Sequence, residues 1–250
     1  MFKKSILLFC MLTMYAQAFI NIEAQIIGEK EKGFEGEVSL EAQYNSGNTN
    51  TQSIGFSAKA QYDAEDWLSF VIASYSYEEA NDERNKDHGL LHWRYINHIE
   101  DTAYDWELFL QDEYNELQNI KTRALAGAGF RRGFDTYFDK FYVGLGLFYS
   151  YMEPQDITDE DLILKRVKVN SYISLKKTFS ERFFVTYVGY LQPNVEDVSD
   201  YTMRHTMQFN TPLTKSLLLS LDLDYQYNAT PYSGVKKDDF SSILNLKFKF

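Results

Sequence analysis

The chain ends in the stretch Phe240-Ser-Ser-Ile-Leu-Asn-Leu-Lys-Phe-Lys-Phe250, in which apolar and polar residues alternate. One parity carries mostly apolar side chains and the other mostly polar ones, which is the period of a β-strand with two unlike faces. The stretch is eleven residues long, and a tilted strand needs about that length to cross a bilayer. We therefore predict that it is the closing strand of a membrane-spanning β-barrel.

The same alternation recurs through most of the chain from residue 34 onward. Segments of about ten residues are separated by turn residues or polar loops, and about twelve such segments are present. Connections after even-numbered segments are mostly short, and those after odd-numbered segments are often long and acidic, although the first hairpin breaks this trend. An even strand number with this asymmetry is typical of outer-membrane barrels. The predicted fold is all-β: a transmembrane antiparallel barrel of about twelve strands, closed between its first and last strand.

Two segments fit the pattern less well. The stretch Trp67–Tyr77 begins with apolar residues on both parities, so its faces are not assigned and a bulge is one explanation. The polar run from Glu78 to Asp87 is predicted to be a loop.

Alternation alone does not say which face points outward, because a lipocalin-like soluble barrel would place its apolar face inside. Three features favour the membrane barrel: aromatic residues near strand ends, a polar face that mixes charges with Gly and Ser, and a chain that ends on a strand with a terminal Phe. The aromatic residues concerned are Tyr44, Tyr62, Tyr75, Tyr77, Tyr149, Tyr151, Tyr225 and Tyr227.

The N-terminus has the organisation of a secretory signal peptide. Residues 1–18 contain two lysines, a short apolar run and an Ala-Gln-Ala site that ends at Ala18. The apolar run is too short for a transmembrane anchor. We predict cleavage near Ala18, a polar leader over 19–33 and a barrel over 34–250.

The charge balance and the cysteine content exclude several classes of function. The formal net charge is −11, and it becomes −13 without the two lysines of the signal peptide. An acidic chain argues against nucleic acid as a partner. The only cysteine, Cys10, lies in the signal peptide, so neither a disulfide framework nor a thiolate metal site is expected afterwards.

Several short motifs resemble a known family. They are Ser46-Gly47-Asn48-Thr49 between two amphipathic segments, Arg94-Tyr95, and Arg123-Ala-Leu-Ala-Gly127-Ala-Gly129-Phe-Arg131. Over residues 34–250 the chain resembles the YdiY-like salt-induced outer-membrane proteins, a family of unknown function. The resemblance implies the outer membrane of a Gram-negative bacterium and a link to salt or envelope stress, with no established activity. The terminal Phe250 resembles the signal that the barrel assembly machinery recognises, and outer-membrane lipids are the other expected partner.

The polar parity supplies the candidate functional residues, which are expected to line the lumen. They are Glu35, Glu37, Glu41, Lys59, Arg94, Glu107, Arg123, Arg131, Lys168, Arg204, Asp222, Asp224, Lys247 and Lys249. Two interpretations stay open: a salt-bridge plug that stabilises the barrel, or a narrow passive channel for ions or small solutes. We also expect Lys247 and Lys249 to lie beside the first strand's acidic residues across the seam.

Other chemistry has weaker support. His88 and His92 share a face, but four residues along a strand span roughly 13 Å, too far for one metal ion. His205 lies on the apolar parity, where a barrel lipase would need a serine on an adjacent strand, and neither neighbouring segment offers one there. A barrel enzyme that acts on lipid or peptide is kept as an alternative. The acidic loop Asp156–Asp161 lacks the ligand spacing of a calcium loop, although a surface receptor that uses such loops remains an alternative. No catalytic residue, metal or cofactor is predicted.

Overall fold

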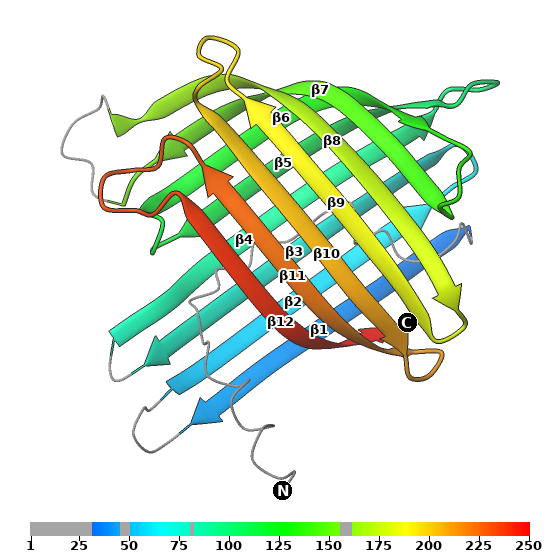
Figure 1. Ribbon diagram of the computed structural model, residues 1–250, viewed down its shortest axis with the longest axis horizontal. Helices are drawn as coiled ribbons and strands as arrows, with labels where there is room; N and C mark the ends of the chain where they lie inside the picture. Colours follow the sequence, from blue (N-terminus) through cyan, green and yellow to red (C-terminus); the bar gives the residue numbers. More distant parts are fainter. Residues whose placement is uncertain (1–31, 46–50, 81–82, 156–161) are drawn as a thin grey trace, which may run out of the picture.

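The computed structural model describes residues 32–45, 51–80, 83–155 and 162–250. Within these residues, antiparallel strands form one closed barrel in which each strand pairs with its sequence neighbours and the last strand pairs with the first (Figure 1). The strands are β1 (Gly33–Asn45), β2 (Thr51–Asp63), β3 (Trp67–Ala80), β4 (Glu83–His98), β5 (Tyr104–Asn115), β6 (Ile120–Gly133), β7 (Lys140–Glu153), β8 (Leu164–Ser180), β9 (Phe183–Pro193), β10 (Tyr201–Pro212), β11 (Leu217–Asn228) and β12 (Asp238–Lys249). The predicted twelve-stranded closed barrel is therefore confirmed.

The barrel closes where β1 meets β12. Gly36 and Phe250 exchange both backbone hydrogen bonds, with N···O distances of 2.9 and 3.0 Å. Glu37 lies opposite Lys249, and the register with β1 covers four residues of β12, whereas the register of β12 with β11 covers eleven. The seam is thus short, and it places acidic and basic positions of the two terminal strands side by side.

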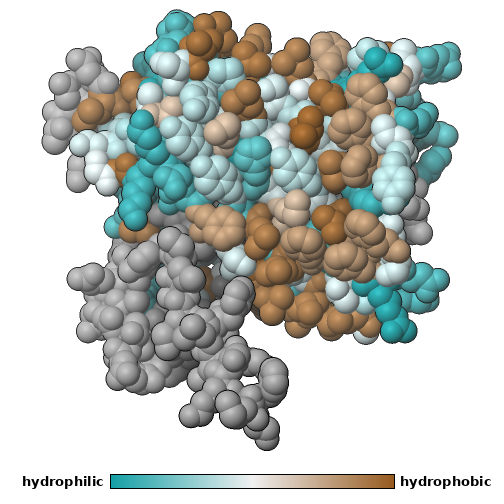
Figure 2. Space-filling view, in the orientation of Figure 1, coloured by the Kyte–Doolittle hydropathy of each residue, from teal (hydrophilic) through white to brown (hydrophobic). Residues whose placement is uncertain are grey.

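The outer face of the barrel is apolar. Leu145 on β7 is 63% exposed and Leu244 on β12 is 65% exposed, while inward neighbours such as Lys168 and Asn210 are buried. Figure 2 shows hydrophobic side chains grouped over the lower and right-hand part of the visible outer face, with pale side chains across its middle and most of the strongly hydrophilic ones toward the left and right margins. A water-soluble barrel has the opposite arrangement, so this barrel presents the surface of a membrane-spanning one.

No helix in the described part of the chain is both long and apolar enough to cross a membrane.

Aromatic side chains form a continuous row across β2 to β5. The row lies near the end of the barrel where β1 begins at Gly33 and β12 ends at Lys249. Tyr62 contacts Trp67, Trp67 stacks on Tyr95, and Tyr95 contacts Trp106, with ring centroids 5.3 to 5.7 Å apart. Amphipathic rings of this kind gather where a barrel surface passes from lipid to water. We call this end the turn end and the opposite one the loop end.

One local prediction was wrong. The run Glu78–Asp87 is mostly strand, because β3 continues to Ala80 and β4 begins at Glu83, with a register shift between Glu78 and Glu79. Only residues 81–82 remain between these strands, so the loop end is not uniformly the end with longer connections.

The ambiguous faces of β3 also have a structural explanation. Phe70 and Ile72 point inward and are buried, where they pack with Leu68 and with Ile96 of β4. An apolar cluster inside the barrel places apolar residues on both parities, so alternation fails there.

Candidate functional site

The candidate site is the barrel interior, and the predicted lumen residues lie on the inward parity of their strands. They are Glu35, Glu37, Lys59, Arg94, Glu107, Arg123, Arg131, Lys168, Arg204, Asp222, Asp224, Lys247 and Lys249. The side chain of Glu41, and the acidic loop Asp156–Asp161, lie outside the described residues.

Near mid-height, side chains from four strands form what we call the central layer: Arg94, Glu107, Phe109, Phe148 and Tyr172. Arg94 Nη2 donates to Glu107 Oε2 at 2.6 Å, and the Tyr172 hydroxyl donates to the same oxygen at 2.9 Å. The Arg94 guanidinium also lies 5.3 Å from the Tyr172 ring centre. β8 pairs with neither β4 nor β5, so the contacts of Tyr172 cross the interior of the barrel.

The aromatic part of the central layer extends it to β7. The ring centroids of Phe109 and Phe148 are 6.1 Å apart, and both side chains are buried. Glycines opposite these rings provide the space: a Cβ on Gly127 would overlap the Phe109 ring, and one on Gly144 would overlap the Tyr172 ring. The glycines on the inward parity of β6 and β7 therefore make room for the central layer.

A second polar cluster occupies the side of the interior formed by β10, β11 and β12. Asp222 accepts hydrogen bonds from Gln208 at 2.9 Å, Asn245 at 3.1 Å and Lys247 at 3.3 Å, and also from Ser220. Such a network fixes the inward side chains of three neighbouring strands, because each buried polar group then has a partner.

A cavity of about 100 Å³ lies on the loop-end side of the central layer. We call it the loop-end chamber. Its wall contains five cationic side chains and no Asp or Glu among the described residues that line it. The cations are Arg94, Arg123, Arg166, Lys168 and Arg204.

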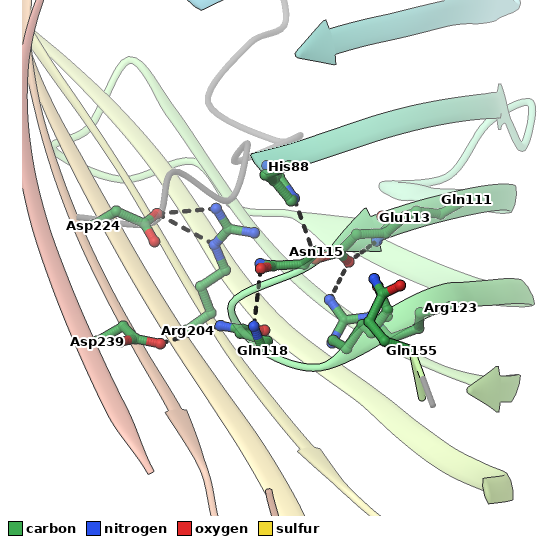
Figure 3. Close-up of polar contacts among 11 residues, drawn as sticks. His88, Gln111, Glu113, Asn115, Gln118, Arg123, Gln155, Arg204, Asp224 and Asp239 are labelled. Atoms are coloured by element: carbon green, nitrogen blue, oxygen red, sulfur yellow. Dashed lines mark hydrogen bonds and ion pairs between the residues drawn. The ribbon is translucent and has the colours of Figure 1, made fainter. Parts of the chain in front are cut away.

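The carboxylates that neutralise these cations lie behind them. Arg204 Nη2 is 3.0 Å from Asp224 Oδ2, and Arg123 pairs with Glu113, which is itself buried (Figure 3). Asp200, at the end of the β9–β10 connection, lies 2.8 Å from Arg166 Nε and 3.5 Å from Lys168 Nζ. The chamber therefore presents cationic donors, with the acidic groups in the surrounding wall.

A second cavity, of about 360 Å³, lies on the turn-end side and shares no lining residue with the first. We call it the turn-end chamber. Its lining is mixed in charge and includes Asp63, Asp105 and Arg131, with Arg131 Nε 2.7 Å from Asp105 Oδ2. Hydrogen bonds from Thr178 lower the pKa of the exposed Asp139 at its rim, so that carboxylate stays charged.

The β11–β12 connection, residues 229–237, lies over the loop end of the interior. Thr230 Oγ1 donates to Asp200 at 2.5 Å, and the Tyr232 hydroxyl lies 3.1 Å from the Leu162 carbonyl oxygen. Gln118 in the β5–β6 turn donates to Asp239 at 3.1 Å, which joins opposite sides of the barrel rim (Figure 3). Burial raises the pKa of Tyr232 to about 12, so its hydroxyl remains a donor at ordinary pH.

The histidines have partners of other kinds. His88 lies 3.3 Å from Glu113, and His92 Nδ1 lies 3.2 Å from Gln111 Oε1. His205 lies 2.7 Å from the Tyr187 hydroxyl, and its partners in the register are Gly189 and Tyr225, not serine. Within the described residues no group of three or more metal-binding side chains is arranged around a common point.

Sequence reasoning did not select several of these residues. Glu113, Asp105 and Arg166 have the inward parity, and a stricter use of that parity would have included them. Phe109 and Tyr172 are uncharged, so a choice of charged residues on the polar face did not include them. Asp200 lies in a connection, where no alternation exists to assign a face.

These features define a class: a β-barrel with an apolar outer surface, a polar interior and two internal chambers separated by a side-chain layer. The chain belongs to the family described as "Protein of unknown function, DUF481", whose model matches residues 38–250. The resemblance to this family that the sequence motifs suggested is confirmed. No curated protein matches the chain.

Solved outer-membrane barrels have a general likeness to the structure. The translocator domain of the autotransporter NalP from Neisseria meningitidis is 9% identical, with a TM-score of 0.47 and coverage of 88% of this chain and 90% of that one. A bacterial polysaccharide outer-membrane secretin is 7% identical, with a TM-score of 0.48 and coverage of 89% and 100%. The NanC porin is 11% identical, with a TM-score of 0.46 and coverage of 87% and 98%.

Proposed function

We propose that this protein is an outer-membrane barrel with a narrow pathway for small solutes, which the central layer closes in the conformation described. The apolar outer surface and the row of aromatic side chains support the membrane location. The signal peptide predicted for residues 1–18 supports export.

One observation carries the pathway: two chambers lie on opposite sides of a layer only a few side chains thick. Arg94, Glu107 and Tyr172 are all buried, at 2%, 1% and 3% exposure, so no water-filled path passes through them. A twelve-stranded barrel is wider than one that its own side chains simply fill and narrower than a general porin. Its permeability therefore depends on whether these few side chains move apart.

The experiment is a solute-flux measurement with folded protein in liposomes. Because the layer closes the lumen, the wild-type barrel is expected to admit small sugars no faster than protein-free liposomes at zero voltage. The double variant with Phe109→Ala and Tyr172→Ala, called the alanine pair below, is expected to admit small sugars. Rapid flux through the wild type would contradict the closed layer, and no flux through the alanine pair would contradict the pathway.

A second candidate, a purely structural barrel, is favoured by the Asp222 cluster. Its hydrogen bonds link β10, β11 and β12 into one network. Under this alternative the interior serves only to hold the strands together, and the alanine pair remains impermeable.

A further inference from the structure

The basic wall of the loop-end chamber has an excess of positive charge at one place. Arg166 and Lys168, two residues apart on β8, both pair with the single carboxylate of Asp200. Asp200 also accepts hydrogen bonds from Thr230 at 2.5 Å and from Asn194 at 3.2 Å. Among the described residues, the one carboxylate that pairs with Arg166 also pairs with Lys168, and Asp197, which Arg166 also influences, is exposed. Two cations that share one buried carboxylate have the charge to bind an anion on this side of the chamber.

The chamber also has neutral hydrogen-bonding groups in fixed positions. Gln192 Nε2 donates to Asn170 Oδ1 at 2.8 Å, and Thr202 Oγ1 donates to Gln192 Oε1 at 3.2 Å. All three residues line the chamber. Amide and hydroxyl groups held in this way suit a ligand with several hydroxyl groups.

His92 provides the strongest sign of a missing partner. Its side chain is 2% exposed and lines the chamber, and its Nδ1 is bound to Gln111. Its Nε2 is buried with no hydrogen-bond partner among the residues that the structure describes. Buried polar atoms normally have a partner. With Nδ1–H donating to Gln111 Oε1, Nε2 of the neutral ring is an acceptor for a hydroxyl group.

From these three observations we propose that the loop-end chamber binds one small carboxylate that carries hydroxyl groups, of the sugar-acid class. The carboxylate is held between Arg166 and Lys168, and a hydroxyl group donates to His92 Nε2. The cavity volume of about 100 Å³ has room for roughly seven to ten water-sized groups, which matches one such molecule rather than a polymer. The inference rests on the proposed function in one respect, namely that solutes reach the chamber through the loop end.

The test is calorimetric titration of the folded full-length barrel in detergent at low ionic strength with D-glucuronate, D-glucose and acetate. D-glucose lacks the carboxylate of D-glucuronate, and acetate lacks its hydroxyl groups. We expect D-glucuronate to bind at least about tenfold more tightly than either, because each lost group leaves a polar partner unsatisfied. No binding of D-glucuronate, or equal binding of D-glucose, would overturn the proposal.

Variants localise the binding. Arg166→Gln and Lys168→Gln are each expected to weaken D-glucuronate binding about tenfold or more. Lys176→Gln is the matched control, because Lys176 has the same inward parity of β8 but lines the turn-end chamber. Equal weakening by Lys176→Gln would contradict the assignment, and heat-modifiable migration in gels checks that each variant is folded.

The outcomes separate this proposal from the proposed function. Binding is measured without a bilayer, so it does not depend on whether the central layer opens. A barrel that fails to bind D-glucuronate but passes solutes after removal of the layer overturns only this inference. A barrel that binds D-glucuronate and stays impermeable overturns only the pathway.

Discussion

The Tyr172 hydroxyl of β8 donates a 2.9 Å hydrogen bond to Glu107 Oε2 of β5, across the interior of the barrel. Arg94 of β4 donates to the same oxygen at 2.6 Å. One buried carboxylate thus holds together side chains from three strands that do not all pair with one another. Under the proposed function, the closed state of the lumen depends on this carboxylate.

Glu107→Gln is therefore expected to destabilise the barrel by about 3 kcal/mol, because it leaves the Arg94 charge buried without its carboxylate. The measurement is urea unfolding of the lipid-reconstituted protein. Glu65→Gln is the control: Glu65 pairs with Lys32 at 3.1 Å, but both side chains are exposed, and such pairs contribute about 0–1 kcal/mol. Equal losses in the two variants would contradict the role given to Glu107.

Gly144→Ala is expected to displace the Tyr172 ring, because an added Cβ would overlap it. The expected cost is about 1–3 kcal/mol, as for other overpacked sites. Gly89→Ala is the control, since the nearest atom to an added Cβ there is Tyr75 Cδ2 at 3.9 Å. Unfolding midpoints that are the same for both variants would show that the glycine is not needed for the central layer.

The seam predicts a specific cross-link. Ser39 of β1 lies opposite Lys247 of β12. Because Gly36 and Phe250 exchange both hydrogen bonds, this pair occupies a site without ladder hydrogen bonds, where opposed Cα atoms are about 4.5 Å apart. In the mature chain, which lacks Cys10 once the predicted signal peptide is removed, Ser39→Cys with Lys247→Cys is expected to form a disulfide on mild oxidation, visible as a mobility shift after denaturation.

Ser39→Cys with Ser241→Cys is the control for this cross-link. Ser241 has the same inward parity of β12 but lies opposite Asp224 of β11, six residues from the partner of Ser39. A cross-link in the control at the same rate would mean that the two terminal strands do not hold one register.

On the lipid-facing surface, the cost in stability of a charged substitution is expected to depend on its depth in the bilayer. Leu145→Arg, in the middle of β7, is expected to destabilise the folded barrel by about 2–4 kcal/mol, because it places a charge near the bilayer midplane. Leu213→Arg is the control, because Leu213 is 51% exposed but lies between β10 and β11 at the turn end. Unfolding in lipid vesicles measures both, and a larger loss for Leu213→Arg would contradict the proposed membrane position.

Much of the fold followed from alternation. The terminal stretch ending at Phe250 predicted a strand that pairs with the first, and the structure places Glu37 opposite Lys249. Alternation failed at Phe70 and Ile72, because they are apolar residues that pack inside the barrel. Periodicity reports which face a residue occupies only when the two faces differ in polarity.

The interior was less predictable for a related reason. Parity selected Arg94 and Glu107 as lumen residues but gave no information on which side chains meet across the lumen. The predicted lumen residues were chosen by charge, so the aromatic Phe109 and Tyr172 were not among them. The glycines on β6 and β7 are a sequence signal that bulky side chains lie opposite. Asp200, which pairs with Arg166 and Lys168, lies in a connection, where no period applies.

Single-channel recording in a planar bilayer tests the central claim most directly. The wild-type barrel is expected to show no current steps above background at low voltage. The variant with Phe109→Ala and Tyr172→Ala is expected to show discrete steps, because it removes two of the side chains that separate the chambers. Steady steps from the wild type, or silence from the folded variant, would contradict a narrow pathway closed by the central layer.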